Sequence, residues 1–405
     1  MILNLLNWII ALVIAFLLGK IVSKLKLPAI LGWLITGMIL GPNAVALIQQ
    51  ELMDDAFYKT IIMWMQCAFG LMLGTELVWK KIKNYGKAML FTTLTQSLGT
   101  FVLVSIVFGI AFACTGIPIY LALVFGGIAL ATAPAPALSI VSEFHTKGPV
   151  TNTLLPMAVL DDIVGIIVFF TVNAFVTRTV SGGNVSLIMI PVMIFLPIVV
   201  GVVVGLLAGV MLIETRNKST TLVILLTGIT VTVTIGYWLN TNVFTSIALN
   251  YMLMGVAFSA TFSNVISEEK LDEVSGDFKP IMGICLIGAI VDLGAPLDYH
   301  LILGAGIYTV IYIVARACGK YYGARTGAKI MKMPETVQKY LGLTLLPHSG
   351  VSLVFTGIIC NTLEIGGESA LAVIVKGTIA AAAVINEIIA VILAKKGFEK
   401  AGEIS

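Results

Sequence analysis

The feature that constrains this chain most is a succession of long apolar stretches separated by short polar segments. Hydrophobic residues make up 59% of the 405 residues and charged residues only 11%, whereas about a quarter of the residues are charged in an ordinary soluble domain. About 20 apolar residues in a helix cross the hydrocarbon core of a bilayer. We therefore predict an all-α, polytopic membrane protein embedded in the lipid bilayer. Its basic residues lie in short loops and form no single patch, so no nucleic-acid partner is expected.

The apolar stretches number thirteen. They run approximately over residues 2–22, 28–42, 58–79, 87–115, 118–142, 151–177, 185–213, 219–239, 242–262, 280–294, 299–323, 337–361 and 369–394. With the N-terminus outside, nearly all lysines and arginines between the stretches fall on the cytoplasmic side, as the positive-inside rule requires. We predict about thirteen transmembrane helices in the inner (plasma) membrane, with the C-terminus in the cytoplasm.

Two adjacent carboxylates, Asp161 and Asp162, lie in the middle of the stretch 151–177. At 1.5 Å per residue they are roughly 17 Å from the start of a helix, which is near the middle of a bilayer. A charge at this depth costs a few kcal/mol or more, so an acidic pair there is by default a functional site. Neighbouring residues on a helix point about 100° apart. One carboxylate can therefore face an ion pathway while the other is held by a partner.

Similar motifs recur seven stretches apart. Val159–Ile163 resembles Val384–Ile388, and a second pair of motifs begins at Cys67 and Cys285. Seven is an odd number, so the members of each pair run through the membrane in opposite directions. This predicts an inverted repeat of six helices, the first to the sixth against the eighth to the thirteenth. Secondary transporters with a site near the midplane are built in this way.

In this repeat, Asn386 and Glu387 occupy the position that corresponds to the aspartate pair, and we expect them to stabilise the core through hydrogen bonds. The stretches 118–142 and 337–361 also correspond, and each contains an interruption. Proline breaks the hydrogen-bond ladder of a helix, so the freed carbonyls and helix ends can meet a cation or a buried charge. The predicted helix breaks lie at Pro134, Pro136, Pro347 and Gly350.

A buried carboxylate in such a place can be neutralised in two ways. Desolvation favours its protonated form, and a nearby cation favours its ionised form. Hard cations such as Na⁺ prefer oxygen ligands. Competition between the proton and the cation for one carboxylate, combined with alternating access, produces exchange. This chemistry needs no cofactor.

The motifs Ala131–Pro134, Asp161-Asp162 and Pro347–Leu353 together resemble those of the monovalent cation/proton antiporter superfamily, in particular the bacterial sodium/proton antiporters with paired aspartates. The resemblance covers nearly the whole chain. It implies two crossed broken helices beside the aspartate helix, and a mobile core domain that slides against a dimerisation domain in a homodimer. The implied segments are scaffold helices in 1–80 and 219–294, core helices in 85–178 and 298–396, and a connecting helix in 184–213.

Carried over to this sequence, the resemblance implies that Asp162 binds the cation or the proton, that Asp161 is its partner and that Thr132 lines the site. Na⁺ would be held by the two aspartates. Electrogenic members pair the first aspartate with a lysine from the helix before the second broken helix, where this chain offers Arg316 and Lys320. Arg316 lies deeper and is favoured, but an arginine cannot release a proton, which leaves the stoichiometry open.

The predicted function is exchange of Na⁺ or Li⁺ for H⁺ across the cell membrane by elevator-type alternating access, in the service of sodium transport and pH homeostasis. Two alternatives remain. One is a K⁺/H⁺ antiporter of the potassium-efflux type, whose members usually have glutamine in place of the first aspartate. The other is a sodium-coupled organic-acid symporter of the same fold, which would need no aspartate pair. The sequence contains no hydrolase, zinc-protease or nucleotide-binding motif in a suitable context, so no enzyme is predicted.

Overall fold

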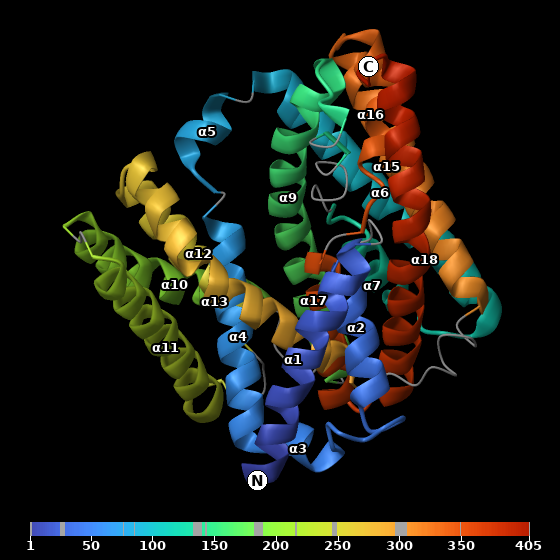
Figure 1. The fold of residues 1–405 in the computed structure, drawn as a ribbon. Helices are drawn as coiled ribbons and strands as arrows, with labels where there is room; N and C mark the ends of the chain where they lie inside the picture. Colours follow the sequence, from blue (N-terminus) through green and yellow to red (C-terminus); the bar gives the residue numbers. More distant parts are fainter. Residues whose placement is uncertain are drawn as a thin grey trace. The chain divides into compact units, whose positions relative to one another are not determined.

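The computed structural model describes most of the chain as helix (Figure 1). The residues that it describes are 2–24, 29–75, 77–84, 86–132, 140–141, 144–181, 189–214, 217–244, 249–295, 306–348 and 350–404. They form sixteen α-helices, and seven of these are long and apolar enough to cross a membrane. The predicted all-α membrane class is confirmed.

The chain divides into two compact units. Unit 1 consists of Met1–Leu17, Ile35–Lys83 and Thr177–Pro296, and unit 2 consists of Leu18–Leu34, Asn84–Val176 and Leu297–Ser405. The helices α1 (Ile2–Lys24) and α2 (Ala29–Leu40) contribute to both units.

Unit 1 contains the helices that follow α2 and those in the middle of the chain. They are α3 (Gln50–Asp54), α4 (Ala56–Gly74), most of α5 (Trp79–Asn84), α10 (Met189–Ile213), α11 (Lys218–Asn242), α12 (Tyr251–Val265) and α13 (Glu268–Gly294). Helix α12 packs against both α4 and α10. In lipid, helices gain no hydrophobic driving force from one another, so close packing of this kind and interhelical hydrogen bonds hold them together.

Helix α13 begins well before the apolar stretch 280–294 that predicted it. Its N-cap is Ser267, whose side chain accepts a hydrogen bond from the backbone N–H of Lys270 at 3.3 Å. Glu268 and Glu269 follow in the first turn, where negative side chains favour a helix start. A search for apolar residues misses these turns because they are charged.

Unit 2 contains the segments that carry the predicted site. Its helices are α6 (Gly86–Thr115), α7 (Tyr120–Ile128), α9 (Pro149–Val180, as far as Val176), α15 (Gly306–Ile330), α16 (Glu335–Thr344), α17 (Gly350–Ile365) and α18 (Ser369–Ala401). Helix α15 packs closely on α6: a Cβ atom added at Gly323 would stand 2.7 Å from the Cα atom of Gln96. Only glycine permits this approach of the two backbones.

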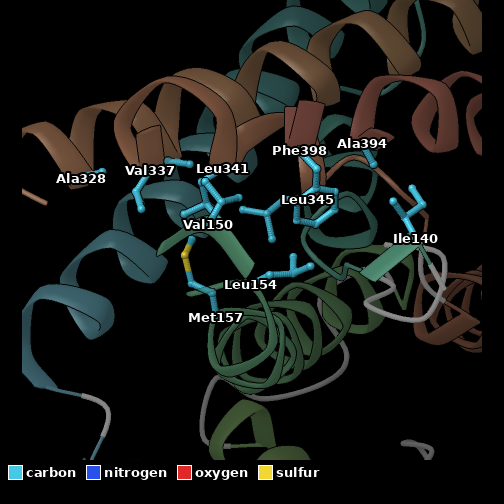
Figure 2. Packing of buried hydrophobic residues seen from close by; sticks show 11 residues of the cluster. Ile140, Val150, Leu154, Met157, Ala328, Val337, Leu341, Leu345, Ala394 and Phe398 are labelled. Atoms are coloured by element: carbon cyan, nitrogen blue, oxygen red, sulfur yellow. The ribbon is translucent and has the colours of Figure 1, made fainter. Parts of the chain in front are cut away.

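A buried apolar cluster joins the start of α9 to the other helices of unit 2 (Figure 2). Val150, Leu154 and Met157 of α9 pack there against Leu341 of α16 and Phe398 of α18. The cluster is completed by Ile140, Ala324, Ala328, Val337, Leu345 and Ala394. It packs the N-terminal part of α9 against α15, α16 and α18.

Two non-helical segments lie side by side within unit 2. Helix α7 ends at Ile128 and the chain is not helical from Ala129 to Thr132, whereas Leu345 to His348 separate α16 from α17. Thr132 and His348 pair in an isolated antiparallel β-bridge. The backbone groups at two interrupted helices are thereby brought together in one place.

Candidate functional site

Asp161 lies at the centre of a buried polar network in unit 2. It is carried by α9, and its side chain is inaccessible to solvent. Its Oδ1 accepts a hydrogen bond from the Ser97 hydroxyl of α6. Its Oδ2 accepts one from the Thr132 hydroxyl at 2.5 Å and lies 2.6 Å from Nζ of Lys320 on α15. The carboxylate is thus held by donors from α6, α15 and the break after α7.

The Lys320 ammonium group is as deeply buried as its partner. Besides Asp161, it donates to the Thr132 hydroxyl at 2.7 Å and to the backbone carbonyl of Leu130. An ammonium group has three protons to donate, and these acceptors use all of them. Removing one member of a buried ion pair leaves an uncompensated charge and costs about 3–5 kcal/mol. Each of the two buried charges therefore compensates the other and lowers the cost of burying it.

The basic partner of Asp161 corrects our prediction. Depth along the helix favoured Arg316, but Lys320 makes the ion pair. Arg316 lies one turn before Lys320 on α15 and is also buried. Depth alone was a poor guide because it ignores which other groups nearby need a donor.

Arg316 donates to backbone carbonyls of both helix breaks. Its acceptors are the carbonyl oxygens of Ala129 at 3.1 Å, Ala131 at 2.9 Å, Leu346 at 2.5 Å and Pro347 at 3.2 Å. Carbonyls at the end of a helix have no partner within the helix and carry partial negative charge. A guanidinium group offers five donors in a planar fork, so one arginine can serve both breaks.

Further polar contacts support the second break. Asn386 of α18 is buried and donates to the carbonyl of Leu346 at 3.0 Å. His348 Nε2 lies 3.0 Å from the Tyr312 hydroxyl of α15. The structure thus assembles Asn386 and Pro347 with Arg316 around the break, while Gly350 is the first residue of α17.

Asp162 has a different environment from Asp161. The residue is partly exposed although its Oδ1 atom is buried, whereas Asp161 is fully buried. Lys320 lies within electrostatic reach of both carboxylates and of Arg316. Two acidic and two basic side chains therefore act on one another across a small region of low dielectric.

Some predicted residues fall outside the part that the structure describes. Pro134 and Pro136 belong to residues 133–139, which lie outside it. The backbone of Glu387 is part of α18, but its side chain is also outside the description. Their predicted roles stay predictions.

The contribution of α6 was not predicted from the sequence. Ser97 contacts Asp161, and it belongs to a row of fully buried polar side chains on this helix. The row consists of Thr92, Thr93, Gln96, Ser97 and Thr100. Residues three or four positions apart share a helix face, so this spacing within an apolar stretch was a readable signal. Neither amide atom of Gln96 has a hydrogen-bond partner among the described residues.

The chain matches the model of a known family over nearly its whole length. The family model described as sodium/hydrogen exchanger, transmembrane, matches residues 9–395, which is nearly the whole chain. No curated protein matches it in sequence.

Solved structures match the fold over nearly the full length of the chain. The structure of the sodium proton antiporter MjNhaP1 from Methanocaldococcus jannaschii at pH 8 has a TM-score of 0.73 and 19% identity, and the match covers 100% of this chain and 99% of that one. An electron-microscopy map of the same antiporter has a TM-score of 0.67 and 20% identity, with 98% and 96% of the two chains covered. At such identities the likeness is one of fold.

Proposed function

This chain belongs to the sodium/hydrogen exchanger family, and we propose that it exchanges Na⁺ or Li⁺ for H⁺ across the cell membrane. The family is one of transporters and not of enzymes. One observation carries the proposal: of two adjacent carboxylates on α9, Asp161 forms the ion pair with the buried ammonium of Lys320, whereas Asp162 lies outside that pair and is partly exposed as a residue, although its Oδ1 atom is buried. The two acids are thereby given the different roles that an exchange site needs.

Asp162 is the proposed point of competition. Desolvation favours its protonated form, and a cation favours its ionised form, so proton and cation replace one another there. Na⁺ and Li⁺ prefer oxygen ligands, which Asp162, Asp161 and the Thr132 hydroxyl can offer. Thr132 and Asp161 are in contact at 2.5 Å, so two of these oxygen-bearing groups already lie together.

The charges of the site favour release of a proton when a cation arrives. With all four groups ionised, Asp161 and Asp162 formally balance Arg316 and Lys320. An added Na⁺ makes the region net positive, which favours deprotonation of a nearby group. Arginine cannot release its proton, whereas a buried lysine can. We propose Lys320 as a second proton carrier, which makes the exchange electrogenic.

The finer architecture is part of the same proposal. It has about thirteen transmembrane helices in inverted repeats, two crossed broken helices, the N-terminus outside and a homodimeric scaffold. The helices in 85–178 and 298–396 form the moving core. The β-bridge between Thr132 and His348 and the hydrogen bonds of Arg316 to both breaks support the pairing of the broken helices.

The alternative cargoes differ in what they require of the site. K⁺ needs the same oxygen ligands as Na⁺ in a larger cage, so a K⁺/H⁺ antiporter is the second candidate. A sodium-coupled organic-acid symporter needs a polar substrate cavity and gives no role to an ion pair such as that between Asp161 and Lys320. The buried pair favours a proton-coupled cation exchanger.

The test is transport by the purified protein in sealed liposomes that contain a pH dye. A proton gradient is imposed, and Na⁺, Li⁺, K⁺ or a bile acid is added in turn, with the voltage clamped or free. Changes in internal pH with Na⁺ and Li⁺ that depend on the clamp would establish electrogenic sodium/proton exchange. A response to K⁺ alone would move the chain to potassium efflux, and no response to any inorganic cation would reject the antiporter.

A further inference from the structure

Beyond the last turn of α18, Glu403 binds the first turn of α9. Its Oε1 accepts a hydrogen bond from the backbone N–H of Val150 at 2.7 Å, and its Oε2 accepts from the backbone N–H of Thr151 at 2.9 Å and from the Thr151 hydroxyl at 2.7 Å. The Glu403 carbonyl also accepts from the N–H of Lys147 at 3.3 Å. Glu403 is itself buried, so this contact belongs to the packed part of unit 2.

These hydrogen bonds provide acceptors for the first backbone N–H groups of α9. The first N–H groups of a helix have no partner within it. Pro149 has no N–H, and the first intrahelical bond runs from Asn152 to the Gly148 carbonyl at 3.0 Å. The N–H groups left between them are those of Val150 and Thr151, and Glu403 binds both. A carboxylate at this end also complements the helix dipole.

A glycine on each side of the contact, Gly148 before α9 and Gly402 after α18, allows the backbone arrangement that it needs. A Cβ atom added at Gly148 would stand 2.4 Å from Cδ of Glu403, so a methyl group at this position and the carboxylate in its present place exclude one another. At the other side, Gly402 ends α18 in the left-handed conformation with φ of 72°, which glycine adopts without strain. Val150 and Phe398 lie in the same buried cluster next to it (Figure 2).

The contact links α9 to the second helix break. Helix α18 donates from Asn386 to the Leu346 carbonyl, which Arg316 also binds, and its end holds α9 through Glu403. The first half of α9 has fewer backbone hydrogen bonds of its own because Pro156 lies inside the helix and offers no N–H.

We propose that Glu403 is a positioning residue for the cation site. Its carboxylate fixes the start of α9 and so sets the position of Asp161 and Asp162 relative to Thr132 and Lys320. Asp161 follows Thr151 by about 15 Å along the same helix, so a shift of the first turn moves the carboxylates directly. The part of this inference that concerns cation binding rests on the proposed function.

The experiment compares Glu403→Ala, Glu403→Gln and the wild type, with Glu399→Gln as a matched control. Glu399 is one turn away on α18, and its side chain makes an exposed contact with Lys395 at 4.0 Å. Two quantities are measured: amide hydrogen exchange along α9 in detergent, and the apparent KM for Na⁺ in the liposome assay.

For Glu403→Ala we expect faster exchange of α9 amides from Val150 through Asp162, and an apparent KM for Na⁺ raised roughly fivefold, the factor that corresponds to the loss of a typical N-cap. The maximal rate should change less than KM. Glu403→Gln retains one acceptor oxygen, so its effect should be smaller, and Glu399→Gln should behave as the wild type.

Gly148→Ala provides a second route to the same state, because its methyl group expels the carboxylate without altering it. We expect it to reproduce the effects of Glu403→Ala on hydrogen exchange and KM. In the double variant Gly148→Ala with Glu403→Ala, the methyl group has room, so both quantities should change no more than in either single variant. Additive effects would contradict the proposal.

Faster exchange confined to the first turn of α9, with KM unchanged, would overturn the inference and leave Glu403 as an ordinary helix cap. The two proposals fail in different ways. A wild type that responds to no cation refutes the proposed function, and the hydrogen-exchange profile then decides alone whether Glu403 holds the carboxylate region in place.

Discussion

Replacing Lys320 by methionine tests the buried ion pair most severely. The substitution keeps the length of the side chain but removes the ammonium group, which is 2.6 Å from Asp161 Oδ2. The carboxylate would keep its hydrogen bonds from Ser97 and Thr132 and lose its ammonium partner. Breaking a buried pair by removing one partner costs about 3–5 kcal/mol. We expect the melting temperature in detergent to fall by on the order of 5–10 °C.

The double variant Lys320→Met with Asp161→Asn separates the cost of a lone charge from the value of the pair. It leaves no uncompensated charge, so it should recover most of the stability that either single substitution loses. The assay is thermal unfolding of the four proteins in one detergent. A control is Lys339→Gln, which breaks an exposed pair with Glu335 on α16 and should leave the melting temperature close to that of the wild type.

Two results would refute this reasoning. Additive losses in the double variant would mean that Lys320 and Asp161 are stabilised by separate partners. A loss for Lys320→Met no larger than that for Lys339→Gln would mean that the charges are solvated and the pair is not buried.

Two further substitutions probe the neighbourhood. Arg316→Lys should lower the free energy of unfolding by about 1–3 kcal/mol for each break carbonyl left without a donor, because one ammonium group cannot reach all four carbonyls. The control is Arg325→Lys, which makes the same change at an exposed position on the same helix. Equal melting temperatures for both variants would contradict the bridging role of Arg316. Gln96→Leu should not reduce stability, because neither amide atom has a described partner, but it should alter the apparent KM for Na⁺ if water or the cation binds there. A fall in melting temperature would show that a protein group holds this amide.

The helices were predictable where residue type alone decides the structure. Long apolar stretches such as 151–177 can only be buried helices in a bilayer, and α9 follows that stretch closely. Proline marked the second break, because Pro347 cannot continue a helix ladder, and it lies between α16 and α17. The start of α13 was not predicted, because its first turns are charged and the prediction relied on apolar residues.

The partners within the site were harder to predict, because they depend on distances between helices. Arg316 and Lys320 are one turn apart and fit the same pattern, and only the carbonyls left open at the breaks decide which of them pairs with Asp161. Ser97 belongs to a polar row whose spacing indicates a shared helix face, but the sequence does not show that this face meets Asp161, which lies far away in the chain. Glu403 resembles any charged residue after a helix until its contact with α9 is seen.

Competition between cation and proton for Asp162 can be tested by measuring sodium uptake driven by a pH gradient in liposomes. Asp162→Asn is compared with the wild type and with Asp272→Asn, which makes the same change at an exposed position of α13. Asparagine can neither ionise nor carry a proton, so Asp162→Asn should take up no sodium above the level of empty liposomes, while Asp272→Asn should equal the wild type. Uptake by Asp162→Asn at the wild-type rate would contradict the account.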